Sequence, residues 1–494
     1  MALPVWSDQR ILDQLLTGYR WYGGTITYSF PTTTASLSGA TELRSFSRLT
    51  AAQQDKATLA LQLWGDLIPP TIQKSTGATD IEFGLTGDGT TYASTYFPSG
   101  GTVWFNKNES SLTAPVIGQH GFISYIHEIG HALGLDHMGD YNGSGNWTPS
   151  CYQDSTVDTV MSYFGPDWQK GEDQVAWADW TGSDGVIYAP QTPQLNDILA
   201  IQKIYGASTS TRVGNTIYGF NSNISDTTSQ IFDFTTNKNP IITIYDSSGA
   251  DTLDLSGWTD NETIDLRPGE FSSGNAMTNN IAIAYNTIIE NAVGGTGDDQ
   301  FTGNRANNFL DGGDGVDRVI YNYLRKDFSF KLSGDALTVT DALPGREGVD
   351  TLVNIERVNF NDGALVLDIP QSSANSSLYR LYQASFARAP DEAGFRFWVA
   401  QSSAGDDPNS IATSFISSSE FKSKYGVDVT NAQYVDLLYQ NVLDRLPDAA
   451  GQAFWVDMLQ SAGLSRQDVL LSFANSPEDI AKTAANTDNG YWLV

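Results

Sequence analysis

The chain has 494 residues, 40% of them hydrophobic, so we expect roughly two to four domains that each bury a core. It carries 27 Lys and Arg residues against 57 Asp and Glu residues, a formal net charge of −30. A surface this acidic repels nucleic acids and anionic membranes, so we expect neither as a partner. The alternative explanation of the charge is a solvating surface or adaptation to salt. No apolar run approaches about 18 residues, so the sequence predicts no transmembrane helix.

Cysteine usage and the first residues bear on the cellular compartment. Cys151 is the one cysteine, so no intrachain disulfide can form. That usage suits a reducing compartment, and equally a secreted bacterial protein that is stabilised by metal. Residues 1–30 show no basic start followed by an apolar core, so no ordinary signal peptide is predicted.

Helical and strand patterns alternate up to residue 206, which indicates an α+β or α/β fold with a mixed sheet. The spacing of apolar residues predicts helices over 11–22, 51–68 and 195–205, and a further helix around 122–133. Alternating patterns predict strands over 25–30, 80–85, 91–97 and 102–105.

The most informative stretch is HEIGHALGLDH, residues 127–137, which holds three of the four histidines. On a helix, His127 and His131 lie one turn apart on the same face. Gly134 can adopt the positive φ that ends a helix and turns the chain, which would bring His137 to the same point. Neutral imidazoles that converge in this way form a zinc site, and without a cation they would be costly to bury together.

Glu128 lies about 100° around the helix from His127, so it can reach a metal-bound water rather than the metal. The full pattern HExxHxxGxxH is that of metzincins, which also contain a downstream turn with a methionine. The segment Val160-Met161-Ser162-Tyr163 provides that turn.

Three features nearby allow more than one interpretation. His120 lies seven residues before His127, about 10 Å along a helix, which is too far for the same metal, so we expect a surface or first-turn position. Cys151 follows the histidine helix, and we interpret it as structural rather than as a latch on the metal. The strand over 91–97 is either an edge that binds extended substrate or an ordinary covered strand.

From about residue 207 the pattern changes, and nine-residue repeats begin at Gly294, Gly303 and Gly312 with the sequences GGTGDDQFT, GNRANNFLD and GGDGVDRVI. This repeat is typical of a parallel β-roll that binds calcium. The glycines allow tight turns whose carbonyls face the ion, the sixth-position Asp supplies charge, and the eighth-position apolar residue packs inward.

The candidate calcium-binding residues come from the first and third copies: Gly294, Gly295, Gly297, Asp299, Gly312, Gly313, Gly315 and Asp317. The middle copy has Asn308 at the sixth position and lacks two glycines, so its site is predicted to be weak or absent. The alternative is a β domain with ordinary Gly and Asp turns.

Residues 371–494 are predicted to be helical and contain a second repeat with a period of 57. The first copy, Tyr382, Arg388, Pro390, Asp391, Gly394 and Trp398, recurs as Tyr439, Arg445, Pro447, Asp448, Gly451 and Trp455. We expect paired helical hairpins that pack through the tryptophans and serve as a packing or binding module.

These motifs, together with Gly139-Asp140-Tyr141-Asn142 and DILAIQKIYG at 197–206, resemble the serralysin family of secreted bacterial metalloproteases over roughly residues 20–320. The resemblance implies that His127, His131 and His137 bind zinc and that Glu128 is the general base. It also implies that Tyr163 is a movable zinc ligand that stabilises the transition state, and that Met161 forms a floor beneath the metal.

The resemblance further implies an α+β fold with a metzincin-like zinc protease domain over 1–206, which has a mixed sheet and an active-site helix. An RTX-type parallel β-roll follows over 207–370, and the helical domain over 371–494 is additional to the usual family architecture. Such a protein would be extracellular, exported by type I secretion machinery with a C-terminal signal in residues 488–494, and would act on proteins or peptides, as a monomer. The alternative is a calcium-binding surface or adhesion protein with an inactive protease-like domain.

Overall fold

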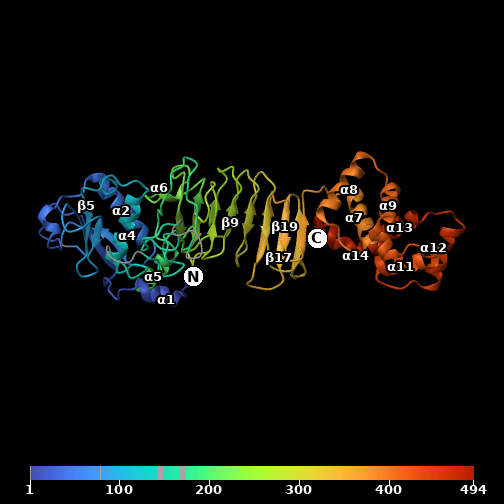
Figure 1. Cartoon of the computed structure of the whole chain (residues 1–494), viewed down its shortest axis with the longest axis horizontal. Coiled ribbons are helices and arrows are strands. Elements are labelled where there is room, and N and C mark those ends of the chain that lie inside the picture. The colour runs from blue at the N-terminus through green and yellow to red at the C-terminus, as the bar shows by residue number, and fades with distance from the viewer. Residues whose placement is uncertain (1, 78, 143–147, 167–173) are drawn as a thin grey trace. The chain divides into compact units, whose positions relative to one another are not determined.

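The computed structural model describes residues 2–77, 79–142, 148–166 and 174–494. The chain divides into two compact units, residues 1–315 with 344–351, and residues 316–343 with 352–494. This division lies inside the predicted domain 207–370, so the three domain boundaries stay a prediction. The order of elements along the chain is the predicted one: a mixed α+β region, then short parallel strands, then helices (Figure 1).

The first unit begins with a mixed five-stranded sheet in the order β2-β1-β3-β5-β4. Its strands are β1 Thr25–Ser29, β2 Thr71–Lys74, β3 Ile81–Thr86, β4 Ala93–Thr95 and β5 Thr102–Asn106. Every residue of β3 and β5 is buried, as expected of central strands covered on both faces. Strand β4 is antiparallel to β5 and lies at the edge of the sheet.

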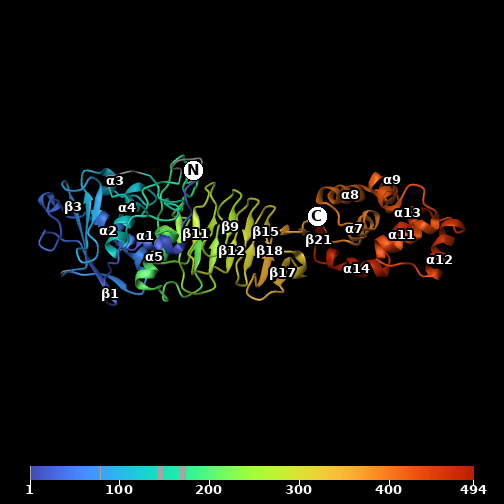
Figure 2. The same ribbon diagram turned by 60° about the horizontal axis from the view of Figure 1, so that its bottom comes forward.

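Two long helices pack beside this sheet (Figure 2). Helix α2, Ala51–Gly65, begins with a capping box between Thr50 and Gln53, and Nε1 of Trp64 near its end donates to the carbonyl of Ile126 at 3.0 Å. That carbonyl belongs to α4, His120–Leu133, so the two helices are joined by a polar contact inside an apolar interface. The predicted buried residues of α4 are confirmed: Phe122, Ile123, Ile126, Ile129 and Leu133.

Smaller helices complete this region: η1 Glu42–Ser45, α3 Ser110–Thr113 and α5 Leu195–Tyr205. The predicted helix over 195–205 is confirmed, whereas the helix predicted over 11–22 is wrong after residue 15, because α1 spans Asp8–Leu15. Leu16 instead forms an antiparallel bridge with Leu135, and Thr17 donates to the carbonyl of Gly134. After residue 15, the chain therefore pairs with the distant segment around Leu135 instead of continuing the helix that its spacing predicts.

The first unit continues with α6, Ser229–Phe232, and a series of short strands, most of which pair in parallel. The strands are β6 Ile217–Gly219, β7 Ile242–Ile244, β8 Thr252–Asp254, β9 Thr263–Asp265, β10 Phe271–Ser272, β11 Ile281–Ile283, β12 Asn291–Val293, β13 Gln300–Thr302 and β14 Phe309–Asp311. In one sheet β6, β8, β12 and β14 are parallel neighbours, and in another β9 pairs with β13. Consecutive strands β12, β13 and β14 alternate between the two sheets, which is the roll architecture expected from the sequence.

The eighth positions of the nonapeptides face inward, as predicted: Phe301, Leu310 and Val319 are 0% exposed. Glycines allow successive turns to approach closely. A Cβ on Gly295 would lie 2.3 Å from the carbonyl oxygen of Trp258, and one on Gly313 2.2 Å from that of Gly295. Only glycine fits at both positions.

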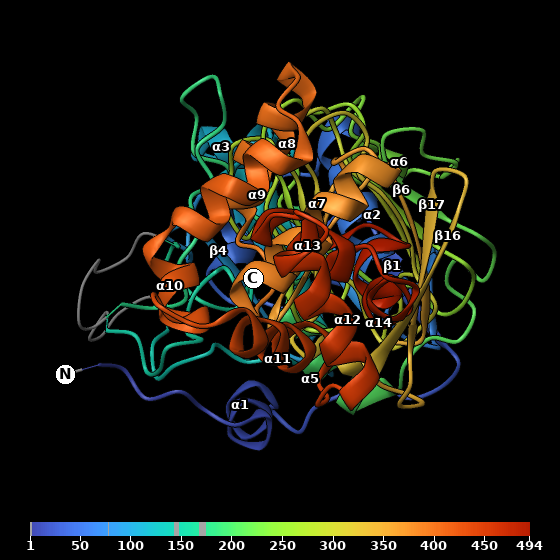
Figure 3. The same cartoon turned by 90° about the vertical axis from the view of Figure 1, so that its right-hand side faces the viewer.

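The second unit holds the remaining strands and eight helices. Its strands are β15 Arg318–Ile320, β16 Phe328–Ser333, β17 Ala336–Asp341, β19 Arg357–Phe360, β20 Gly363–Val366 and β21 Tyr491–Leu493, with η2 Arg325–Asp327, and β18 Val349–Val353 spans the division. Its helices are α7 Ser373–Phe386, α8 Glu392–Ala404, α9 Pro408–Ser417, α10 Ser419–Tyr425, α11 Asn431–Leu443, α12 Ala449–Gln460, α13 Arg466–Ala474 and α14 Pro477–Thr487 (Figure 3). Strand β21 pairs antiparallel with β20, which ties residues near the end of the sequence to the strand before α7.

Equivalent contacts recur in the two halves of the helical region. Arg388 binds Glu420 at 2.7 Å, and 57 residues later Arg445 binds Glu478 at 2.7 Å. Asp391 and Asp448 each cap the following helix by accepting from the backbone N–H three residues on, at 2.8 Å. Each copy contains four helices, α7–α10 and α11–α14, rather than the single hairpin expected, and the duplication as a domain stays a prediction. Among the described residues, no helix combines the length and apolar composition needed to cross a membrane.

Candidate metal centre

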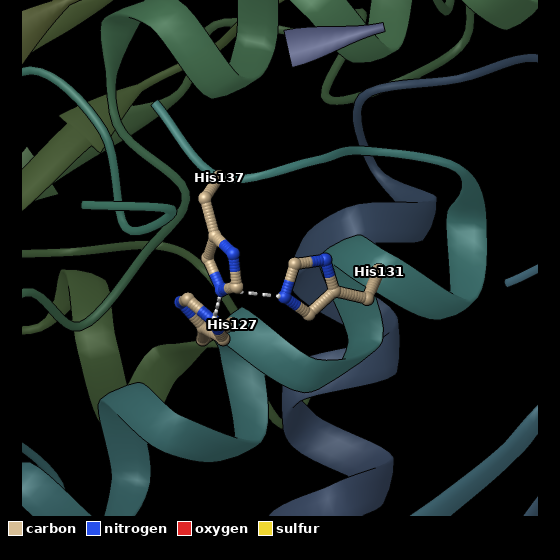
Figure 4. A group of neighbouring side chains, drawn as sticks. All are labelled: His127, His131 and His137. Atoms are coloured by element: carbon tan, nitrogen blue, oxygen red, sulfur yellow. Dashed lines mark hydrogen bonds between the residues drawn. The ribbon is translucent and has the colours of Figure 1, made fainter. Parts of the chain in front are cut away.

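Three imidazoles from α4 and the turn after it point toward one another (Figure 4). Nε2 of His137 lies 3.2 Å from Nε2 of His127 and 3.1 Å from Nε2 of His131. The helix supplies the first two rings one turn apart, and Gly134, at φ 112°, ends the helix so that the chain can return with His137. The predicted convergence of the three histidines is therefore present.

Hydrogen bonds of the opposite ring nitrogens fix the orientation of two of these rings. Nδ1 of His127 lies 2.7 Å from the carbonyl oxygen of Val160, and Nδ1 of His131 lies 2.7 Å from that of Leu135. A carbonyl can only accept, so each Nδ1 carries the proton and each Nε2 presents a lone pair to the shared point.

Burial determines the charge of these rings. Desolvation, and then the charge of the neighbouring histidine, lowers the pKa of His127, His131 and His137 to about 3. All three are therefore neutral at pH values near 7, which is the form that binds a metal ion. Nitrogen ligands at about 2.0–2.1 Å from a tetrahedral zinc lie about 3.3 Å apart, so the two spacings of 3.2 and 3.1 Å from Nε2 of His137 fit zinc.

Glu128 lies beside this centre, 7% exposed, and Oγ1 of Thr95 donates to its Oε2 at 2.6 Å. Burial raises the pKa of Glu128 to about 7, and the hydrogen bond from Thr95 opposes that shift. The buried carboxyl is thus poised to exchange a proton near neutral pH. Thr95 belongs to the edge strand β4, and sequence reasoning missed it, because nothing local marks a threonine whose partner lies on another element.

Met161 packs directly beneath the histidine helix. It is 0% exposed, and its Sδ would lie 2.7 Å from a Cβ added to Gly130, between the two helical histidines. The glycine thus leaves the space that the methionine fills, which agrees with the floor expected from the sequence.

Replacing Gly130 with alanine should lower the free energy of unfolding by about 1–2 kcal/mol, because overpacking outweighs the helical preference for alanine. Thermal unfolding checks this, with Gly24→Ala as the control, since a Cβ there meets nothing within 4 Å. Equal melting temperatures for the two variants would contradict the packing described.

Tyr163 lies at the rim of the histidine cluster. Its ring centroid is 4.7 Å from that of His137 and 4.6 Å from that of Tyr141. Asp154 holds this arrangement, since it accepts from the hydroxyl of Tyr141 at 2.6 Å and from that of Ser162 at 2.8 Å. Tyr163 is thus brought to the candidate centre, and its role there stays a proposal.

The other two residues singled out from the sequence lie apart from the cluster. His120 is the first residue of α4 and is exposed, with Nδ1 2.8 Å from the hydroxyl of Tyr92, as expected of a first-turn histidine. Cys151 is 0% exposed, and burial raises the pKa of its thiol to about 12. A thiol with so little thiolate is unreactive, which agrees with a structural role.

Known families match several parts of the chain. The matrixin model matches residues 20–144, the peptidase M10 serralysin C-terminal model matches 207–373, and a domain of unknown function matches 412–483. Serralysin G of Dickeya chrysanthemi is 35% identical over 334 residues, which cover 62% of this chain and 67% of that protein. The chain belongs to the serralysin family. Family membership implies zinc, and the three-histidine cluster fits that ion.

Two further serralysin relatives give the same result. Metallopeptidase AprA of Pseudomonas marginalis is 34% identical over 331 residues, which cover 62% of this chain and 67% of that protein. Serralysin B of Dickeya chrysanthemi is 37% identical over 296 residues, which cover 56% of this chain and 57% of that protein. Since the alignments leave a third or more of each relative uncovered, what the whole relatives do is a proposal for this chain.

Sequence reasoning also missed Asp197, which fixes the methionine turn of this serralysin from the start of α5. Its buried carboxylate accepts from Oγ1 of Thr159 at 2.6 Å and from the backbone N–H groups of Val160 and Gln194, each at 2.7 Å. The carbonyl of Val160 in turn accepts from Nδ1 of His127, so the carboxylate supports the candidate ligand through one intervening residue. An acidic residue in the first turn of a predicted helix was the available signal.

In the roll, carboxylates recur at the position just before several strands. Glu262 precedes β9 and Asp299 precedes the neighbouring β13, and the N–H of Glu262 donates to Oδ1 of Asp299 at 2.7 Å. Both carboxylates also accept from the N–H of Gly295, at 3.2 Å and 2.9 Å. In the second unit, Asp317 and Glu356 hold the same positions before β15 and β19. The nonapeptide pattern identified one residue of each pair.

The Glu262–Asp299 pair is nearly inaccessible to water, at 1% and 0% exposed. Burial, and then the contact with Asp299, raises the pKa of Glu262 to about 9. Two ionised carboxylates that share the N–H of Gly295 would repel each other, so the buried pair requires either a proton or a cation.

This pair predicts how stability depends on pH. Because the folded-state pKa of Glu262 is raised, its contribution is present below the unfolded value near 4.5 and is lost as the pH rises toward about 9. We therefore expect the melting temperature without calcium to fall between about pH 5 and 9, and a cation to offset the fall. Thermal unfolding across this pH range, in chelator and in calcium, measures the effect. The same fall of melting temperature with pH in both conditions would refute the prediction.

Proposed function

We propose that this serralysin is a secreted, calcium-stabilised zinc endopeptidase with Glu128 as its general base. The observation that supports this best is the combination of three neutral imidazoles on one point with a buried carboxyl beside them. The Nε2 lone pairs of His127, His131 and His137 are the proposed zinc ligands, and their spacing suits the ion.

Zinc held by these three histidines would supply a Lewis acid, which would lower the pKa of a water molecule and polarise the scissile carbonyl. Thr95 holds Oε2 of Glu128, so Oε1 is the oxygen that takes the proton of the attacking water. The same carboxyl then delivers that proton to the leaving amine. Tyr163, whose ring lies beside those of His137 and Tyr141, would be the further, movable zinc ligand, and its hydroxyl would donate a hydrogen bond to the developing oxyanion.

The edge strand β4 is the proposed site for the peptide substrate. It lies beside α4 and has a neighbour, β5, on one side only in the sheet. An extended peptide can therefore add to β4 through main-chain hydrogen bonds. Because Thr95 on this strand also binds Glu128, a peptide added there would lie next to the general base.

Calcium is the proposed ligand of the roll. The residues expected to bind it are those of the first and third nonapeptides, and the carboxylates of Glu262, which is buried, and Glu356, which is partly buried, extend that set. Calcium prefers carboxylate and carbonyl oxygens, which these turns supply. Binding confined to the folded state would couple folding to calcium, consistent with proposed export of an unfolded chain by type I secretion machinery into a calcium-containing medium.

Chelation tests the proposed activity. Removing zinc from the purified protein should abolish cleavage of casein, and adding one equivalent of zinc should restore it while calcium is kept constant. Cleavage that persists after zinc is removed, or a protein that never binds zinc, would leave the adhesion-type alternative as the better account.

A further inference from the structure

His137 is the one histidine of the proposed zinc site that α4 does not carry. His127 and His131 are fixed by the helix and by their Nδ1 hydrogen bonds, whereas His137 lies beyond Gly134, which ends the helix. Its position relative to the other two rings therefore depends on what holds the segment 134–138.

On one side, this segment is held by the methionine turn, since the N–H of Met138 donates to the carbonyl of Met161 at 3.2 Å. On the other side it is held by residues 14–17, which come from far away in the sequence. The N–H of Asp136 donates to the carbonyl of Leu15 at 2.8 Å, and Nε2 of Gln14 donates to the carbonyl of His137 at 3.1 Å.

The remaining contacts of residues 14–17 continue this pairing. Leu16 and Leu135 form an antiparallel bridge. The N–H and Oγ1 of Thr17 both donate to the carbonyl of Gly134, at 3.3 Å and 2.7 Å. Each residue from 134 to 137 is therefore paired with a residue of the N-terminal segment.

This N-terminal segment is itself firmly attached. The buried face of α1 consists of Ile11 at 2%, Leu12 at 8% and Leu15 at 0% exposed. Before the helix, the N–H of Trp6 donates to the side chain of Gln153 at 3.0 Å, and Gln153 donates back to the carbonyl of Trp6 at 2.9 Å. Residues 14–17 can thus transmit the rigidity of the core to His137.

We infer that Gln14 and Thr17 are positioning residues of the zinc centre, which hold His137 where its Nε2 meets those of His127 and His131. The inference rests on the proposed zinc site. A ligand on an unrestrained turn must be ordered when the metal binds, and this cost lowers affinity. Mutation of a residue that holds a metal ligand in place usually lowers metal affinity about 10- to 100-fold.

The test compares Gln14→Ala and Thr17→Val with two matched variants. Gln9→Ala removes a glutamine of the same helix whose side chain binds only the exposed Asp13, and Thr17→Ser keeps the hydroxyl. Zinc affinity is measured by chelator competition, the ligand geometry by the visible spectrum of the cobalt-substituted protein, and the stability of the zinc-free protein by thermal unfolding.

We expect Gln14→Ala and Thr17→Val to bind zinc about tenfold more weakly with an altered cobalt spectrum, and Gln9→Ala and Thr17→Ser to match the parent. The zinc-free melting temperature of Gln14→Ala should stay close to that of the parent. If Gln14→Ala binds zinc as tightly as the parent, or if Gln9→Ala loses as much zinc affinity as Gln14→Ala, the positioning role is refuted. A parent that binds no zinc would instead refute the proposed function.

Discussion

Replacing Glu128 with glutamine should lower kcat/KM for casein or a peptide about 10³-fold while zinc content stays unchanged. Glutamine has nearly the same shape and can still accept the hydrogen bond from Thr95, but it cannot take a proton from water. The measurement is initial cleavage rate together with zinc per chain, each at fixed calcium.

Two controls make this result specific. Glu128→Ala should lose cleavage as well and keep zinc, because Glu128 is not among the proposed zinc ligands. Thr95→Val should leave zinc content intact and lower kcat more than it changes KM, since it removes only the hydrogen bond that orients the carboxylate. Cleavage by Glu128→Gln at the parental rate would contradict the proposed mechanism.

Replacing both Asp299 and Asp317 with alanine should remove most of the stabilisation that calcium provides. A site filled at 100 times its Kd contributes about 2.7 kcal/mol, so losing two sites should lower the melting temperature in calcium on the order of 10 °C. In chelator the double variant should be less affected than in calcium, because it also removes repulsion between buried carboxylates. Thermal unfolding at several calcium concentrations measures both.

The chain offers a matched control within the same turns. Asp298 and Asp314 are exposed residues of the same two repeats, so their double alanine variant changes the net charge equally and keeps the carboxylates of Asp299 and Asp317. That control should keep the calcium response. If the two double variants respond alike, the stabilisation reflects general charge screening, and the roll does not bind calcium through its sixth-position carboxylates.

The sequence predicted those parts of the site that depend on local structure. His127, Glu128 and His131 lie within one helical turn of each other, and Gly134 marks the end of that helix, so their geometry follows from spacing alone. The inward-facing Phe301 and Leu310 were likewise predictable, because a nine-residue repeat places them at equivalent positions.

The contacts that join distant segments could not be predicted in this way. Gln14 meets His137 across 123 residues, and Glu262 meets Asp299 across 37, because sheet register and core packing decide these pairings. The wrong helix prediction over 16–22 has the same origin, since bridge formation with Leu135 outweighs helical propensity. Patterns in one segment carry no information about such partners.

Diffraction data collected at the zinc absorption edge from crystals of the purified protein would show whether the three histidines hold zinc. We expect one strong anomalous peak about 2.0–2.1 Å from Nε2 of each of His127, His131 and His137. Absence of a peak there in protein that contains zinc, or a peak bound by other residues, would contradict it.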